Sequence, residues 1–440
     1  MPAIRKKAKG GKIAGRKKGK GKKGKKGKGK KKGKKTKPLL GAKKIRSPGE
    51  ATQQFHKAYV RICKERNSTP VAEIMANCKE KAEEDKAVTK FTLEPASRFS
   101  QSVYPPVVFA DWLKAVQEIY YDYVKELCVW GVRVTDMDAT NLALCMETDA
   151  GRRNLELLTF LSTSLTAFGL KRIIRSIRLG SLVRLNVSHN RFGDEGCLVM
   201  CDGIAGNYVL QYLSMDFCGL TPAVGEKLGQ AILTSGISEL SLGGNSLQCD
   251  GLIQLINPYI EALESRSIHE KNRREQLKEF AEREAEKRKE RAALGPLQAK
   301  LMEEKEDMGK LDYGDLNGYL VPSPPLPPLK YMNVEDNGID VHGKGGKYAP
   351  VVSMRLVRRW IEASAILREI NLCGNLIGEP AARELLTALE ARKEASLSPI
   401  CLTVTHCIEH ELFAKIVKLG SVKKKKKLLG KKKKKKGKRK

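Results

Sequence analysis

The sequence lacks the features that mark secreted and membrane proteins. Its 11 cysteines include no Cys-x-x-Cys pair and lie mostly within apolar patterns, so we expect buried thiols in a reducing compartment. No uninterrupted apolar run is long enough to span a bilayer. Lysine and glycine occupy the positions where a signal peptide would have its hydrophobic region. These absences predict a soluble intracellular protein.

Motifs for catalysis or metal binding are also missing. None of the six histidines lies in metal-ligand spacing with a cysteine or carboxylate cluster. His406 and His410 are four residues apart, but the glutamate pattern of a metalloprotease does not follow. There is no G-x-S-x-G elbow, and Lys35-Thr36 is not preceded by the glycine of a phosphate loop. We therefore expect a chain that is not an enzyme, with no cofactor, no metal and no small-molecule substrate.

The positive charge is concentrated at the two ends of the chain. Residues 1–46 contain 23 Lys or Arg, residues 421–440 contain 14, and neither segment has an acidic residue. Since the whole chain carries +33, the 374 residues between these ends carry −4. Both ends are rich in lysine and have almost no apolar residue to bury, so we expect two disordered basic tails.

A strand–turn–helix pattern recurs through the middle of the chain. Its template is L-x-x-L-x-L-x-x-N-x-L, in which alternate strand residues point inward and a helix follows. The copies begin at Val124, Leu155, Leu182, Leu210, Ile237, Leu329, Leu367 and Leu397. The third to fifth copies are 28 and 27 residues apart, the period that a strand plus a full helix requires. This predicts an α/β leucine-rich-repeat solenoid of the ribonuclease-inhibitor-like class, with parallel strands on the concave face and helices on the convex face.

Asparagine recurs at the polar position of the template. An inward amide there can satisfy backbone groups that are left unpaired at the turn. We interpret these asparagines as structural ladder residues and not as ligands of a substrate. They are Asn190, Asn245, Asn337 and Asn375.

Residues 264–328 interrupt the repeats. The first part has too few apolar residues for a core helix, and it carries Glu-to-Arg pairs at helical spacing. Three such pairs are Glu270–Arg274, Glu279–Arg283 and Glu284–Arg288. We expect an exposed charged helix, followed by an extended proline-rich linker over 321–328, for which a ligand of an SH3-type domain is the less favoured alternative. A second insertion over 342–350 delays the next copy.

The strand residues that flank the inward apolar positions are expected to face a partner. They are more acidic than basic, which predicts a mildly acidic trough with aromatic anchors. The candidate protein-binding residues are Trp130, Arg184, Tyr212, Asp216, Glu239, Tyr331, Glu335 and Glu369. An ordinary solvated strand face explains any single one of them about equally well.

These patterns divide the chain into six segments. We expect a basic tail over 1–46, a helical cap or arm over 47–123, repeats over 124–263, the insertion over 264–328, repeats over 329–420 and a basic tail over 421–440.

Four stretches of the sequence resemble a known family. They are VKELCVWGVRV at 124–134, LVRLNVSHNRFGDEG at 182–196, ISELSLGGNSLQCDG at 237–251 and LREINLCGNLIGE at 367–379. With a basic tail before them and a charged insertion before the last, they resemble the leucine-rich-repeat-containing protein 71 family of organisms with motile cilia or flagella. The resemblance covers roughly residues 100–410. It implies a non-catalytic interaction protein of the ciliary or flagellar axoneme.

The basic tails require an acidic partner. Acidic tubulin C-terminal tails, nucleic acid and anionic lipid all qualify, because many weak screened contacts add up to useful affinity. Lysine without interleaved aromatic residues argues against the reading of bases. We favour an axonemal scaffold whose tails dock on tubulin while the repeats hold another subunit. The alternative is a nuclear or nucleolar RNA-associated protein that uses the tails, and the least favoured hypothesis is an inhibitor that covers a basic enzyme.

Overall fold

The structure is a computed structural model of the 440-residue chain. It describes residues 47–95, 105–148, 154–178, 180–293, 328–343 and 345–421. The predicted basic tails, up to residue 46 and from residue 422, lie outside the described residues. The same holds for 294–327, which includes nearly all of the predicted proline-rich linker.

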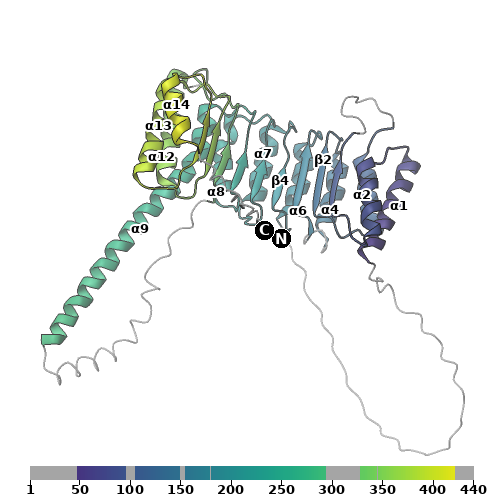
Figure 1. The fold of residues 1–440 in the computed structure, drawn as a ribbon, viewed down its shortest axis with the longest axis horizontal. Coiled ribbons are helices and arrows are strands. Elements are labelled where there is room, and N and C mark those ends of the chain that lie inside the picture. The colour runs from purple at the N-terminus through teal and green to yellow at the C-terminus, as the bar shows by residue number, and fades with distance from the viewer. Residues whose placement is uncertain are drawn as a thin grey trace, which may run out of the picture. The chain divides into compact units, whose positions relative to one another are not determined.

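A nine-stranded parallel sheet forms the centre of the fold (Figure 1). The strands lie side by side in chain order, and each is parallel to the next. They are β1 (Lys90–Leu93), β2 (Glu126–Trp130), β3 (Leu157–Leu161), β4 (Arg184–Asn186), β5 (Tyr212–Ser214), β6 (Glu239–Ser241), β7 (Tyr331–Asn333), β8 (Glu369–Leu372) and β9 (Cys401–Val404). Each of the eight predicted sequence copies contributes one strand, from β2 to β9.

Helices connect the strands and form a second layer (Figure 1). They are α1 (Pro48–Arg66), α2 (Ala72–Glu83), α3 (Phe109–Ile119), α4 (Asp136–Met146), α6 (Ala167–Ile177), α7 (Gly193–Ile204), α8 (Gly225–Leu233), α9 (Gln248–Ala293), α12 (Ala349–Ala363), α13 (Gly378–Glu394) and α14 (His410–Leu419), with short 3-10 turns η1 (Pro222–Val224) and η3 (Gly346–Tyr348). From α3 onward, each helix packs against the next one in the chain. The fold is therefore α/β.

Strand side chains alternate between the core and the open face of the sheet, because successive residues of a strand point to opposite sides. In β4, Leu185 is fully buried while its neighbours Arg184 and Asn186 are not. The strand register aligns these inward residues into one row: Phe91, Leu127, Leu158, Leu185, Leu213, Leu240, Met332, Ile370 and Leu402. Their burial between sheet and helices forms one continuous core.

Strand β1 was not anticipated, because the segment 47–123 was expected to be a helical cap or arm. Helices α1 and α2 do lie in that segment, but β1 joins the sheet as its first strand and pairs with β2. Val88, Phe91 and Leu93 are buried and have the same spacing as the inward residues of the later strands. The Tyr121 hydroxyl connects the residues just before β1 to α1, since it accepts from Val88 N at 2.8 Å and is 3.1 Å from the hydroxyl of Thr52.

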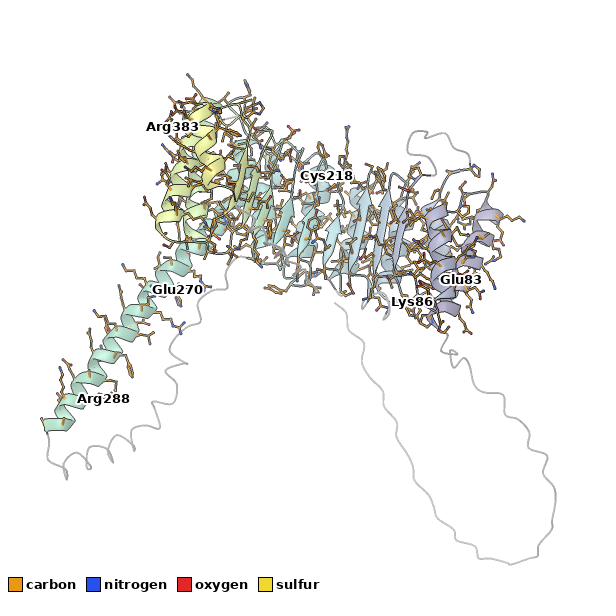
Figure 2. The ribbon with its side chains drawn as sticks, in the orientation of Figure 1. Glu83, Lys86, Cys218, Glu270, Arg288 and Arg383 are labelled. Carbon is orange, nitrogen blue, oxygen red and sulfur yellow. The ribbon has the colours of Figure 1, made fainter. Side chains whose placement is uncertain are left out.

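Helix α9 is longer than the predicted charged helix. It begins at Gln248, and its first turns are buried against α8 and α12. The predicted boundary at residue 264 therefore falls inside one continuous helix, which extends away from the sheet and carries Glu270 and Arg288 (Figures 1 and 2). Of the predicted charge pairs, Glu279–Arg283 forms at 3.9 Å. Glu270 instead pairs with Arg266, four residues before it, and Glu284 pairs with Lys287.

The insertion between β6 and β7 does not interrupt the sheet. Glu239 of β6 is directly paired with Tyr331 of β7, and the backbone N–H of Leu242 donates to Asn333 O at 2.8 Å. Residues from both sides of the insertion are therefore neighbours on one face. The second predicted insertion, 342–350, contains η3 and the first turn of α12 in its described part.

Candidate interaction surface

The face of the sheet opposite the helices presents rows of side chains that cross the strands. We define the first row as the row formed by the first residue of each strand. These residues are aligned by the strand register and are Lys90, Glu126, Leu157, Arg184, Tyr212, Glu239, Tyr331, Glu369 and Cys401. Five of the predicted binding residues thus lie on five consecutive strands, β4 to β8. They are Arg184, Tyr212, Glu239, Tyr331 and Glu369.

Arg184, Tyr212 and Glu239 contact one another across three strands. The guanidinium of Arg184 lies 4.0 Å from the centre of the Tyr212 ring. Its Nη2 is 3.4 Å from Glu239 Oε2, and both side chains are about two-fifths exposed, at 45% and 37%. A cation over an aromatic face is attracted by the ring quadrupole, and the carboxylate adds a screened ion pair. The chain therefore places its own arginine on a tyrosine–glutamate pair.

Tyr331 and Glu369 continue the first row beyond Glu239. Tyr331 is 40% exposed. A shallow hollow of about 360 Å³ lies over β5 to β8, and its lining includes Tyr212, Glu239, Tyr331, Glu369 and Asn371. Aromatic residues with polar neighbours are common at the centres of protein interfaces. This is the part of the sheet face best suited to receive a side chain from another molecule.

The carboxylate of Asp216 is hydrogen-bonded within the fold. One of its carboxylate oxygens accepts from Ser241 Oγ at 2.7 Å and from Gly243 N at 2.6 Å, while the other accepts from Ser214 Oγ at 2.9 Å. Its own N–H donates to Ser188 Oγ at 3.0 Å. Asp216 was predicted to be a binding residue, but these bonds join β4, β5 and β6 and use its hydrogen-bonding capacity within the fold.

Trp130 and Glu335 lie away from the first row. Trp130 ends β2, pairs in register with Leu161 and is 37% exposed. Glu335 follows β7 and accepts a hydrogen bond from Asn371 Nδ2 at 3.0 Å. The structure therefore brings together five of the eight predicted binding residues and leaves Trp130, Asp216 and Glu335 at other positions.

The four asparagines of the template bond to backbone groups of two adjacent turns. Asn245 is representative: its Oδ1 accepts from the N–H groups of Cys218 and Leu220, and its Nδ2 donates to the carbonyls of Met215 and Leu242. Asn190, Asn337 and Asn375 make corresponding bonds and are buried. These bonds to the backbone support the interpretation of the four asparagines as structural ladder residues.

A left-handed residue precedes the ladder position in each turn after β2 to β8. These residues are Gly131, Ser162, His189, Phe217, Gly244, Asp336 and Gly374, with φ between 50° and 74°. The rings of His189 and Phe217 stack at 4.6 Å. A Cβ on Gly244 would overlap the Phe217 ring unless that ring moved, and the φ of 63° also favours glycine there.

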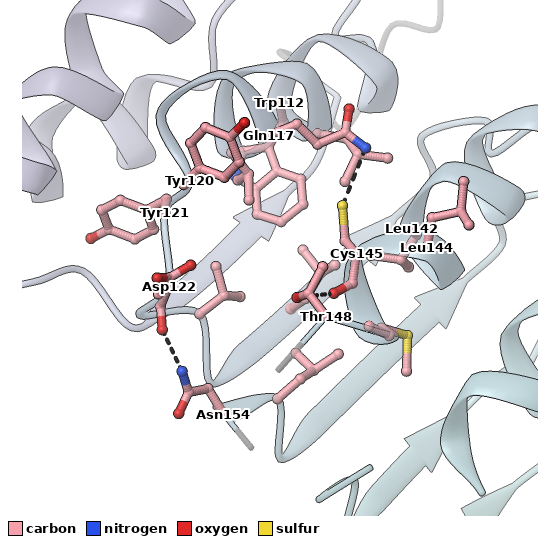
Figure 3. A pocket seen from close by; sticks show the side chains of 16 residues that line it. Trp112, Gln117, Tyr120, Tyr121, Asp122, Leu142, Leu144, Cys145, Thr148 and Asn154 are labelled. Atoms are coloured by element: carbon pink, nitrogen blue, oxygen red, sulfur yellow. Dashed lines mark hydrogen bonds between the residues drawn. The ribbon is translucent and has the colours of Figure 1, made fainter. Parts of the chain in front are cut away.

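A second hollow lies between α3 and α4 (Figure 3). It has a volume of about 380 Å³ and is lined mainly by apolar side chains, including Trp112, Val116, Leu142 and Leu155. Gln117 Nε2 lies 3.2 Å from Cys145 Sγ at its rim (Figure 3). Among the lining residues that the structure describes, none is a histidine and Asp122 is the only carboxylate.

The residues that the structure describes contain no group of three or more metal-ligating side chains. Burial raises the pKa of the thiols of Cys78 and Cys218 to about 12, and such thiols are weak nucleophiles near neutral pH. Within the described ranges, no helix combines the length and apolar character needed to cross a bilayer.

No model of a known protein family matches the chain, and no curated protein matches it.

Proposed function

We propose that the sheet and its helices form a leucine-rich-repeat solenoid of the ribonuclease-inhibitor-like class. Support comes from the strictly sequential parallel strands and from the asparagines that bond consecutive turns. The period of 27 to 28 residues between clear copies fits a strand plus a helix. In such a fold each unit contacts only its neighbours, and the strand face is left open for binding.

We propose that the chain is a non-catalytic scaffold that binds another protein on this face. The observation that carries the proposal is the first row over β4 to β8, where arginine, tyrosine and glutamate are partly exposed on adjacent strands. Tyrosine and arginine contribute most to the binding energy of protein interfaces. The neighbouring ladder asparagines and Asp216 keep the strands in register beneath the partner.

The cellular setting we propose is the ciliary or flagellar axoneme. The resemblance of the repeats and insertion to the leucine-rich-repeat-containing protein 71 family supports it. The 37 basic residues of the two tails fit the acidic C-terminal tails of tubulin. The partners would then be tubulin for the tails and another axonemal subunit for the sheet face.

Localisation of the tagged full chain in a ciliated cell tests this proposal. We expect signal along the axoneme that persists after detergent removes the membrane. A matched variant with the tail lysines changed to glutamine should lose part of this signal, because the tails would no longer attract tubulin. Exclusive nuclear or nucleolar signal that is lost on ribonuclease treatment would favour the RNA-associated alternative instead.

A further inference from the structure

On the described part of the sheet face, the arrangement that holds the guanidinium of Arg184 has a counterpart in which the tyrosine and the glutamate recur without an arginine before them. In the first arrangement, Arg184 on β4 lies over the ring of Tyr212 on β5 and pairs with Glu239 on β6. The order along the first row is therefore cation, aromatic ring and carboxylate on consecutive strands. The chain itself thus shows which group this arrangement accepts.

The same order of ring and carboxylate repeats two strands further on. Tyr331 on β7 is followed in register by Glu369 on β8, as Tyr212 is followed by Glu239. The position before Tyr331, which corresponds to Arg184, is Glu239. In the part of the chain that the structure describes, no lysine or arginine forms an ion pair with Glu369. The ring of Tyr331 therefore lies between two strands that carry carboxylates, and none of the described lysines or arginines lies over it.

We propose that Tyr331 and Glu369 bind an arginine side chain of a partner protein. This rests on the proposed use of the sheet face for protein binding and specifies the chemistry that the face recognises. Neighbouring strands are about 4.8 Å apart, so the partner's arginine would lie about 10 Å from Arg184, two strands away. The hollow that includes Tyr331, Glu369 and Asn371 provides the space.

Arginine fits this site better than lysine for a geometric reason. A planar guanidinium stacks on a ring and donates to a carboxylate at the same time, whereas an ammonium is a compact, strongly hydrated point charge. The Arg184 contacts to Tyr212 and Glu239 have this two-sided geometry. The partner segment should therefore be basic and should present at least one arginine on its surface.

Fluorescence anisotropy of the full chain with a labelled peptide tests the proposal. The probe is acetyl-Gly-Ser-Arg-Ser-Gly-amide carrying an uncharged dye, and the control is the same peptide with citrulline, which has the shape of arginine without the charge. We expect the arginine peptide to bind about fivefold more tightly, as one cation–π contact with one exposed ion pair would give. Equal binding of the two peptides would overturn the proposal.

Four variants locate the binding on the sheet face. Tyr331→Leu and Glu369→Gln should each weaken binding several-fold, whereas Tyr331→Phe should leave it unchanged because the ring is retained. Glu239→Arg should abolish binding, because the introduced side chain would lie over the Tyr331 ring and pair with Glu369. Arg184 makes the same two contacts with Tyr212 and Glu239. Circular dichroism checks that every variant is folded.

Arg184→Gln provides the opposite test. Removing Arg184 vacates the first site, so the chain should bind a second equivalent of the arginine peptide. The inference would be wrong if Tyr331→Leu and Glu369→Gln bound the arginine peptide as tightly as the unaltered chain. It would also be wrong if the full chain did not bind the peptide because its own tails fill the site. Neither result affects the axonemal localisation, which tests the proposed function separately.

Discussion

The side chain of Asn375 joins two neighbouring turns: its Oδ1 accepts the backbone N–H of Asn337 at 2.9 Å, although 38 residues separate the two asparagines. The same oxygen accepts from Ile339 N at 3.1 Å, and Nδ2 donates to the carbonyls of Val334 and Leu372. Each ladder asparagine thus fastens the turn of its own strand to the preceding one. The stability of the sheet edge depends on these bonds because the groups involved are buried.

Replacing Asn375 should therefore be costly. Asn375→Ala leaves the buried N–H groups of Asn337 and Ile339 without their acceptor, and each unsatisfied donor costs about 1–3 kcal/mol. We expect a loss of about 2–4 kcal/mol in the free energy of unfolding, measured by urea denaturation. The matched control is Asn141→Ala on α4, which should change it by less than about 0.5 kcal/mol. Equal effects of the two substitutions would contradict the ladder role.

Gly244 tests the packing of the turns. A methyl group there meets the Phe217 ring and also has to adopt φ of 63°. Gly193 has φ of 64° and open space around it. Gly193→Ala should cost about 1–2 kcal/mol from the backbone alone, and Gly244→Ala should cost clearly more.

The excess cost at Gly244 has a specific source. In a Phe217→Ala background the ring is gone, so Gly244→Ala should cost no more than Gly193→Ala. A double-mutant cycle by thermal or urea unfolding measures this coupling. Additive effects of Gly244→Ala and Phe217→Ala would show that the ring does not cause the strain.

A carboxylate in the inward row should prevent folding. Leu185 and Leu372 have no exposed surface, so Leu185→Asp or Leu372→Asp buries an unpaired charge at a cost of several kcal/mol. We expect insoluble protein, or loss of the far-UV circular dichroism of the native chain. Asn186→Asp, one residue from Leu185 but on the open face, should remain soluble and folded. A native-like Leu185→Asp protein would mean that the strand register is wrong.

The exposed part of α9 should be dispensable for folding. Beyond Leu263 its side chains are largely in solvent, with Ile268 61% and Leu277 44% exposed (Figure 2). Its ion pairs Arg266–Glu270 and Glu279–Arg283 lie within the helix itself. Deletion of residues 265–320 should shift the thermal midpoint by only a few degrees, since little apolar area is lost. A shift of more than about 10 °C would show that this segment packs on the rest of the chain.

Most strands could be predicted from the sequence because inward apolar residues recur with one spacing. Strand β1 was missed although Val88, Phe91 and Leu93 have that spacing, because no ladder asparagine follows and the flanking helices dominate the pattern. The start of α9 was also missed. The composition changes from apolar to charged near residue 264, but nothing in the sequence ends the helix there, and the backbone hydrogen bonds continue.

The candidate site was only partly readable from the sequence. The alternation of strand residues predicts that Tyr212, Glu239, Tyr331 and Glu369 lie on the open face. Whether they lie next to one another depends on how β6 pairs with β7 across the insertion, which the strand pattern does not give. Asp216 has the same alternation, and its bonds to Ser214 and Ser241 cannot be inferred from one strand alone. The left-handed residue of each turn shows no common chemistry, since glycine, serine, histidine, phenylalanine and aspartate all occupy it.

Co-sedimentation with microtubules tests the central claim, that the charged tails dock this scaffold on an acidic filament. The full chain, a 47–420 chain and a chain with shuffled tails are compared on microtubules whose acidic C-terminal tails are intact or removed by protease. Counterion release predicts steep weakening with salt and dependence on lysine number rather than order. The full and shuffled chains should therefore pellet equally with intact microtubules, and the 47–420 chain should not. Equal pelleting of the 47–420 chain, or binding that survives removal of the tubulin tails but is stripped by RNA, would contradict the account.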